Sequence, residues 1–197
     1  SNTPRQLLLY EALGFTAPAF AHLALVMGPD HAPLSKRHGA TSVAEFRSKG
    51  YLPEALVNYL ALIGWSPRES SGGAHGERED DELFPVHELA RRFALEAVSL
   101  SAGVFDEEKL AWANRHYLKQ ADPARLAELS LPFFHQAGIR VGSDAGALDF
   151  LTEVVPIATS SVSRLDEVPG RLAFLFGYSA EAALEHDVVR DEMQAPG

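Results

Sequence analysis

The residues of this chain that are best suited to chemistry lie in one short run from Ala32 to Ala40, A-P-L-S-K-R-H-G-A. Ser35 offers a hydroxyl and a backbone N–H, and Lys36 offers a mobile ammonium group. Arg37 offers a planar fork of donors that can hold a phosphate through two parallel hydrogen bonds, and the following histidine adds another donor. Gly39 permits a positive φ and hence a sharp exit. The run predicts a loop that binds phosphate.

A solvated surface turn is the simpler interpretation of any Ser-Lys-Arg-His run, and the residues alone leave both interpretations open. Pro33 fixes its own φ and directs Ala32 toward extended geometry, so we expect the chain to enter the loop from an extended segment. Leu34 is expected to pin the loop to a hydrophobic core.

Other kinds of catalytic site find little support. The eight histidines show no convincing pair at the spacing of helical metal ligands, and the chain contains no cysteine. No phosphate-binding glycine motif and no nucleophile triad is found. The adjacent acids Asp80-Asp81 and Glu107-Glu108 point in different directions on a helix or strand, so neither pair suits acid and base catalysis. The loop around Lys36 is therefore the main chemical feature.

The elements that position this loop begin with an expected helix from Thr3 to Gly14, which Pro4 opens. The apolar run Phe20 to Met27 predicts a buried strand, which ends at Gly28 and Pro29. A basic loop at the carboxyl end of a strand occupies the place where open α/β sheets bind ligands.

Helices are expected to dominate the rest of the chain. Their starts are indicated by the Ser42 and Glu45 capping box, by Asp106 as an N-cap, and by prolines at first helical positions. The expected segments are Ser42–Gly50, Pro53–Gly64, Pro85–Phe93, a long helix after Asp106, a helix from Pro123, another from Pro132 to near Gly138, a third capped by Ser143 or Asp144 and kinked or ended by Pro156, a core segment Leu165–Phe176, and Ala180–Arg190. The stretch Pro67 to Glu82 predicts a loop.

Composition sets broad limits. The 197 residues, 46% of them hydrophobic, can bury a proper core, and no apolar run is long enough to span a bilayer. We expect no signal peptide, and the absence of cysteine agrees with the expectation of a cytoplasmic protein. A formal net charge of −10 argues against indiscriminate nucleic-acid binding, so any RNA-binding surface must be local.

Together with its surroundings, the loop resembles a known family. L-S-K-R-H-G is similar to the second signature of class I aminoacyl-tRNA synthetases, K-M-S-K-S, in the form typical of the glutamyl-tRNA synthetases. Four further blocks in the right order also look like that family: Ser1–Gly14, Phe20–Leu23, Gly50–Ser66 and Val104–Tyr117.

The resemblance implies that the loop stabilises charge on ATP while an amino acid is activated, before its transfer to tRNA. Ser35 and Lys36 match the third and fourth positions of the signature, and the resemblance implies that Ser35, Lys36 and Arg37 bind ATP, with Lys36 as the catalytic residue. Pro33 stands where the signature has its first lysine, which puts one phosphate contact in doubt. Mg²⁺ is expected only with the nucleotide, and no metal bound by the protein itself is expected.

The resemblance also implies a mainly α fold in three parts. Residues 1–40 would be the tail of a Rossmann-type catalytic domain with one or two short strands, residues 41–121 a helical domain that contacts the tRNA stem, and residues 122–197 part of a helical anticodon-binding bundle. The signature H-I-G-H is absent, so we expect a fragment that lacks the amino-terminal catalytic half and the last helical bundle. Such a fragment alone should not activate glutamate.

The partner implied by the resemblance is the tRNA for glutamate, with the tRNA for glutamine left open, and the expected state is a monomer. Candidate tRNA contacts are Arg115, His116 and Lys119 on the helix after Asp106, with Arg164 and Arg171 as weaker ones. A solvated basic helix edge would explain the first three equally well. Two alternatives stay open for the whole chain: a non-catalytic tRNA-binding or regulatory module derived from a synthetase, and a helical domain without a role in RNA binding.

Overall fold

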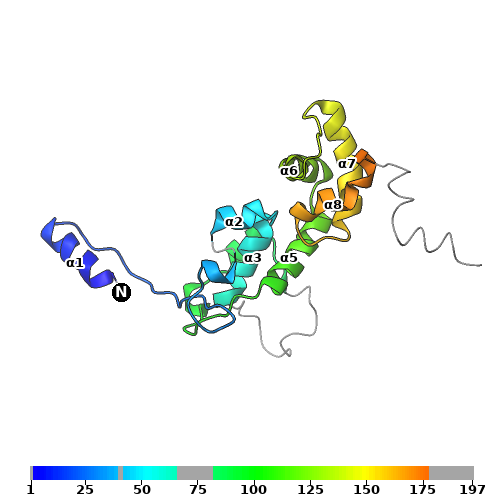
Figure 1. Cartoon of the computed structure of the whole chain (residues 1–197). Helices are drawn as coiled ribbons and strands as arrows, with labels where there is room; N and C mark the ends of the chain where they lie inside the picture. The colour runs from blue at the N-terminus through cyan, green and yellow to red at the C-terminus, as the bar shows by residue number, and fades with distance from the viewer. Residues whose placement is uncertain (1, 40–41, 66–81, 178–197) are drawn as a thin grey trace, which may run out of the picture.

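The computed structural model describes residues 2–39, 42–65 and 82–177, and helices make up most of these ranges (Figure 1). Figure 1 shows α1 at one end of the molecule and α6 to α8 at the other, with α3 and α5 between them. The helices are α1 Thr3–Ala12, α2 Val43–Ser48, α3 Pro53–Gly64, α4 Val86–Arg92, α5 Glu107–Gln120, α6 Pro123–Gln136, α7 Ala145–Thr159, α8 Val168–Leu172 and α9 Phe174–Gly177, and the short 3₁₀ turns are η1 Lys36–His38, η3 Leu95–Ala97 and η4 Leu165–Glu167.

The helix starts follow the capping signals of the sequence. Ser42 and Glu45 form the expected capping box at α2. The Asp106 carboxylate accepts hydrogen bonds from the first-turn amides of α5, and Asp122 and Asp144 do the same at α6 and α7. Each cap satisfies amides that have no partner within their own helix, so these predictions are confirmed.

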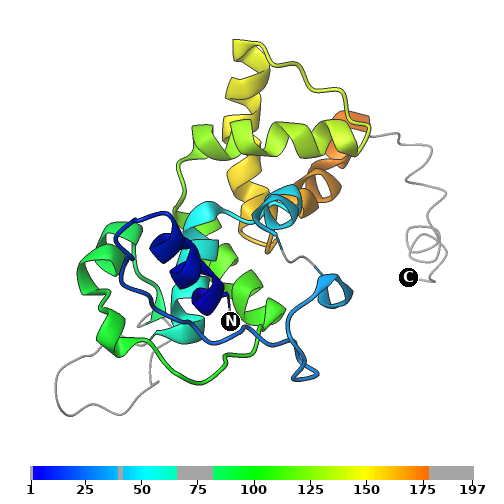
Figure 2. The same ribbon diagram turned by 90° about the vertical axis from the view of Figure 1, so that its left-hand side faces the viewer.

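Two hydrophobic clusters share α3 and α5. The larger cluster joins the first turn of α3 and the end of α5 to α6, α7 and α8, and Phe134, Leu151 and Val155 at its centre are fully buried. In Figure 2, α6 crosses α7 within this cluster. The smaller cluster contains Phe46, Tyr51, Leu56, Tyr59, Phe105 and Leu110. Residues Phe105 and Leu110 meet there, as expected for a hydrophobic contact at the start of α5.

Asn114 of α5 lies fully buried between the two clusters. Its Oδ1 accepts the Leu52 N–H at 2.7 Å, and its Nδ2 donates to the Ser163 carbonyl at 2.6 Å. Gly50, in the same corner, has φ +81° and leaves no room for a Cβ, which would lie 2.6 Å from the Leu165 amide nitrogen. The loop before α3, the helix α5 and the segment before η4 are therefore fixed to one another.

The predicted buried strand from Phe20 to Met27 is wrong. This segment runs extended, but its regular pairing is limited to single bridges of Met27 with Pro33 and with Val104. Leu23 and Leu25 are mostly exposed. A strand needs a neighbouring strand over several residues, and the described residues supply a partner only at Met27. The expected one or two short strands of a Rossmann domain are likewise absent from the described residues.

Two prolines do not act as predicted. Pro132 begins no new helix, because α6 runs without a break from Pro123 to Gln136. Pro156 does not end α7, which continues to Thr159. A proline inside a helix removes one hydrogen bond. Here residues near each proline, Phe133 and Phe134 in α6 and Val155 and Ala158 in α7, are buried in the larger cluster and keep the helix continuous.

The remaining expectations have mixed outcomes. Helix α1 forms as predicted and is followed by Gly14 at φ +67°, but none of its residues is buried. Of the predicted core segment Leu165–Phe176, Leu165, Val168 and Leu172 are buried, whereas Phe174 and Leu175 are exposed. The helix predicted over Ala180–Arg190 lies outside the described residues, as does the Pro67–Glu82 loop except for Glu82. No described helix is long and apolar enough to cross a membrane.

Candidate functional site

The predicted phosphate loop is held by a tight hairpin. The Gly28 N–H donates to the Ala32 carbonyl and the Leu34 N–H to the Val26 carbonyl, so the chain reverses over Pro29 to His31. Met27 also pairs with the segment before α5 through the Gly103 carbonyl and the Phe105 amide. Leu34 packs against the smaller cluster, as predicted. The turn that follows is therefore anchored to the start of α5.

The turn itself is the 3₁₀ segment η1, Lys36–His38, and it ends at Gly39 with φ +105°. The Lys36 side chain is exposed, and its ammonium makes no hydrogen bond or ion pair with any residue that the structure describes. Arg37 behaves differently: its Nη2 lies 3.0 Å from Oδ2 of Asp30. Two neighbouring cations of the predicted site are thus in different states, one free and one paired.

His38 is buried, with only 7% of its side chain exposed. Its Nδ1 accepts the backbone N–H of Ser35 at 3.0 Å, so the neutral ring carries its proton on Nε2. Nε2 lies 3.1 Å from Oδ1 of Asp30 and 3.2 Å from Nε of Arg37. Because a guanidinium has no acceptor, the Nε2–H donates to Asp30. The ring lies against Gly28, where a Cβ would come within 2.8 Å of it.

Asp30 is the residue of this site that the sequence did not reveal. Its carboxylate accepts the Ala32 N–H and faces both His38 and Arg37. The Ala32 hydrogen bond foremost, and then the two side chains, hold the pKa of Asp30 below its ordinary value. The Gly-Pro-Asp sequence of residues 28–30 did signal a turn, but the meeting of Asp30 with residues seven and eight positions later depends on the hairpin.

The candidate tRNA contacts on α5 are exposed or half-buried. Arg115 and Lys119, four residues apart, share one face of the helix. The Arg115 guanidinium donates to the Ser163 hydroxyl at 2.7 Å, whereas Lys119 makes no ion pair with the described residues. His116 turns to another face, where its Nε2 lies 2.7 Å from the Gln120 amide nitrogen.

The other two candidate tRNA contacts, Arg164 and Arg171, differ in whether their side chains are already paired. Arg164 Nε lies 3.0 Å from Asp166 and 3.4 Å from Glu167, and its guanidinium stands over the Tyr51 ring. Burial lowers the pKa of Arg164, but its interactions with Asp166 and Tyr51 together outweigh burial, so the pKa lies above its usual value. Arg171 is exposed on α8. The structure therefore brings Arg115 and Arg164 to the same corner beside Ser163.

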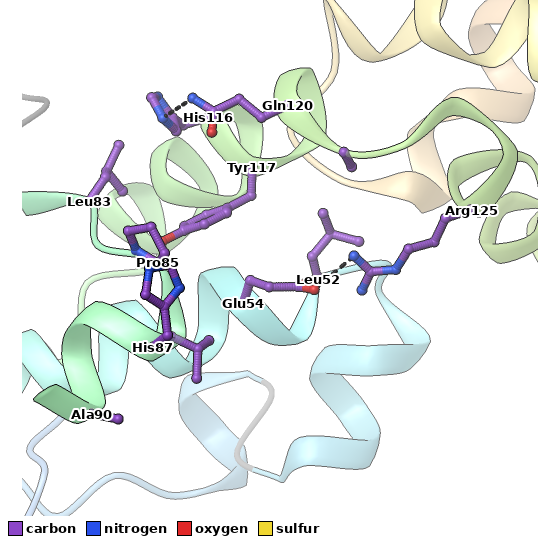
Figure 3. A pocket seen from close by; sticks show the side chains of 12 residues that line it. Leu52, Glu54, Leu83, Pro85, His87, Ala90, His116, Tyr117, Gln120 and Arg125 are labelled. Carbon is purple, nitrogen blue, oxygen red and sulfur yellow. Dashed lines mark hydrogen bonds and ion pairs between the residues drawn. The ribbon is translucent and has the colours of Figure 1, made fainter.

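A groove of about 700 Å³, not foreseen from the sequence, lies between α3, α4, α5 and the start of α6 (Figure 3). Glu54 and Arg125 form an ion pair across it, with 2.7 Å between Oε1 and Nη1. Burial raises the pKa of Glu54, but the hydrogen bond to Arg125, a backbone hydrogen bond and the Arg125 charge together outweigh burial, so the pKa lies below its ordinary value. His116 lines the same groove, and the Tyr117 hydroxyl donates to the Phe84 carbonyl beside it.

No group of three or more His, Asp or Glu side chains that could hold a metal ion occurs among the described residues. The donors of the Lys36 turn are an ammonium, a guanidinium, a hydroxyl and backbone amides. Such donors suit the oxygens of a phosphate rather than a cation.

Comparison with known proteins decides the family. The model of the catalytic domain of class I tRNA synthetases for glutamate and glutamine matches residues 1–112, more than half of the chain. The chain belongs to this family. Its Lys36 turn and the segment up to α5 lie within the matched residues. The family relationship predicted from the L-S-K-R-H-G block is confirmed.

Relatives of known function match over most of the chain. A glutamate–tRNA ligase of Carboxydothermus hydrogenoformans is 44% identical over 188 residues, which cover 95% of this chain and 37% of the relative. A glutamate–tRNA ligase of Geobacter sulfurreducens is 44% identical over 190 residues, which cover 94% of this chain and 38% of the relative. The chain therefore spans little more than a third of the length of these relatives.

A solved structure shows the same fold. The glutamate–tRNA synthetase of Elizabethkingia anophelis superposes with a TM-score of 0.64 at 24% identity, over 98% of this chain and 40% of that protein. The mainly helical arrangement of the described residues is therefore an arrangement found in a synthetase of this kind.

Proposed function

We propose that this chain is part of a glutamate–tRNA ligase and supplies a phosphate-binding turn and tRNA-facing helices to that enzyme. The observation that carries the proposal is the exposed Lys36 ammonium on a turn that follows a hydrogen-bonded hairpin, at the position of the family's second signature, in a chain that belongs to the family. The 44% identity with two glutamate–tRNA ligases supports glutamate as the amino acid.

The proposed chemistry at the turn is electrostatic. Activation of glutamate by ATP releases pyrophosphate, and negative charge shifts on the phosphates as the bond to the α-phosphate breaks. Lys36 would stabilise this charge, while Ser35 would offer its hydroxyl and Arg37 would act once it leaves Asp30. A cation that is already in place acts without reorganisation during the reaction. Mg²⁺ would enter with the nucleotide, and no residue of this chain is assigned to it.

The test of the turn is glutamate-dependent exchange between pyrophosphate and ATP. The 197-residue chain by itself should show none, since the amino acid site is assigned to the remainder of the ligase. We would then replace the matching segment of the Carboxydothermus hydrogenoformans ligase with this chain. In that hybrid, Lys36→Ala should lower kcat by about 10²–10³. Exchange that is unaffected by Lys36→Ala would refute the role of the turn.

The proposed tRNA-facing surface is the exposed face of α5 that carries Arg115 and Lys119. Binding of a glutamate-specific tRNA to the chain should weaken steeply with salt, since each phosphate contact releases counterions. Arg115→Ala and Lys119→Ala should each lower the magnitude of the salt slope by about 1. The matched control is Arg91→Ala, which removes an exposed arginine of α4 that pairs with Glu88 and should leave the slope unchanged. Equal effects of all three substitutions would contradict this assignment.

The division into a catalytic tail over 1–40, a stem-contact domain over 41–121 and an anticodon-binding part over 122–197 is part of the same proposal. Support comes from the two hydrophobic clusters, which separate α6 to α8 from the segment around α2 and Phe105. Helices α3 and α5 contribute to both clusters, so we propose that the last two parts move as one unit.

A further inference from the structure

We infer that His38 is a positioning residue for Lys36, and this inference rests on the proposed function of the turn. The imidazole binds the Ser35 amide from within the turn and thereby sets the direction in which the Lys36 side chain projects from the turn. Asp30 contributes to this positioning, because it fixes which nitrogen of the His38 ring carries the proton.

The first argument is burial. His38 follows two exposed cations and yet has only 7% of its side chain exposed. A solvated basic turn would present all three side chains to water. The ring instead fills the space above Gly28, where even a methyl group would lie 2.8 Å from Cε1 of the ring. The hairpin over residues 28–31 is therefore shaped around this ring.

The second argument is hydrogen bonding. Ser35 is the N-cap of η1, and its N–H donates to Nδ1 of His38 three residues later. This is the geometry in which a glutamate or glutamine side chain reaches back to an N-cap amide. The other ring nitrogen faces Asp30 at 3.1 Å, so both ring nitrogens are used. A phenylalanine would fill the space but would leave the Ser35 amide without its partner.

The third argument is the register of the turn. A 3₁₀ helix has three residues per turn, so successive side chains diverge by about 120°. With His38 directed inward, Lys36 is directed to solvent, while Arg37 stays at the edge of the hairpin and reaches Asp30. Rotation of the turn about its axis would bring Lys36 toward the protein and would require the ring to leave its place on Gly28.

The experiment separates hydrogen bonding from packing through three substitutions. His38→Gln keeps an acceptor for the Ser35 amide, His38→Phe keeps only the bulk, and His38→Ala removes both. In the full 197-residue chain, hydrogen–deuterium exchange of the Ser35 amide is the direct measurement. We expect exchange to accelerate about five- to tenfold in His38→Phe and His38→Ala and to stay near the original rate in His38→Gln.

Gly28→Ala provides an independent route to the same state, because its Cβ would displace the ring. It should accelerate Ser35 exchange as His38→Phe does. It should add little to His38→Ala, where the ring that it would displace is already absent, so the two substitutions should be strongly non-additive. Additive effects, or unchanged Ser35 exchange in His38→Phe, would overturn the inference.

The functional measurement uses the hybrid ligase described above. His38→Phe should lower kcat for pyrophosphate exchange about ten- to a hundredfold with little change in the KM for ATP. The reason is that a misplaced Lys36 ammonium loses its stabilising interaction mainly with the transition state. His38→Gln should stay within about threefold of the parent. A merely space-filling role would instead leave His38→Phe active. If Lys36→Ala has no effect in the hybrid, the proposed function fails. The hydrogen–deuterium exchange rate of the Ser35 amide then still decides whether His38 holds the turn.

Discussion

Replacement of Asn114 by alanine should destabilise the chain more than any change of its exposed polar residues. The side chain is fully buried and joins α5 to the Leu52 amide at 2.7 Å and to the Ser163 carbonyl at 2.6 Å. A third contact, to the Gly50 carbonyl at 3.5 Å, is too long to contribute much. Asn114→Ala therefore leaves two backbone groups without partners.

The cost follows from what happens to each of these groups. An unsatisfied buried group costs about 1–3 kcal/mol. Leu52 is only 2% exposed, so its amide should carry a cost near the upper limit. Ser163 is half-buried, and water can reach its carbonyl after the substitution, so its cost should be near the lower limit. We expect the free energy of unfolding to fall by about 3–4 kcal/mol.

Urea denaturation, followed both by circular dichroism and by tryptophan fluorescence, measures this change. The matched control is Asn2→Ala, which removes an exposed asparagine whose side chain makes no capping bond to α1, and it should change the free energy of unfolding by less than about 0.5 kcal/mol. If Asn114→Ala costs less than about 1 kcal/mol with an unchanged slope in urea, the two buried hydrogen bonds do not hold this junction.

Two further substitutions, with one control, test the packing and the ionisation of residues around α3. Gly103→Ala should destabilise the chain by about 2 kcal/mol or more in thermal unfolding, because its Cβ would lie 2.4 Å from the Ile63 carbonyl oxygen, whereas Gly64→Ala, with open space around it, should be neutral or slightly stabilising. Burial, foremost, raises the pKa of Tyr59 from 10.0 to about 12, so its contribution to stability is complete below pH 10 and is lost as the pH rises toward 12. Tyr59→Phe should accordingly make the loss of stability over this pH range shallower by at most about 3 kcal/mol, and identical alkaline slopes would refute the assigned pKa.

Local signals in the sequence predicted the helix starts well, because a cap and the amides that it binds lie within three residues of each other. Ser42 with Glu45, Asp106 and Asp144 all behave in this way. Arg164 shows that a local signal can also be overlooked: the acids that hold it follow two and three residues later, at Asp166 and Glu167. Their spacing could have indicated a paired arginine.

The errors arose where distant residues decide the outcome. The apolar run from Phe20 to Met27 satisfies the pattern of a buried strand, but whether a strand forms depends on neighbours that pair with it. Pro132 and Pro156 carry the usual signal of a helix boundary, yet burial of neighbouring residues in both helices compensates for one lost hydrogen bond. Neither the groove beside Glu54 nor the joint at Asn114 leaves a short-range pattern in the sequence.

The Lys36 turn combines both kinds of information. Its residue types indicated phosphate, and its resemblance indicated a synthetase with Lys36 as the catalytic residue, but neither interpretation distinguished an exposed side chain from a paired or a buried one. The fold separates them: Lys36 is free among the described residues, Arg37 is held by Asp30, and His38 is buried. Since all three follow one another in a single 3₁₀ turn, the burial of one determines the exposure of the other two. A substitution at His38 should therefore alter the behaviour of Lys36 without touching its charge, which substitution of Lys36 itself cannot reveal.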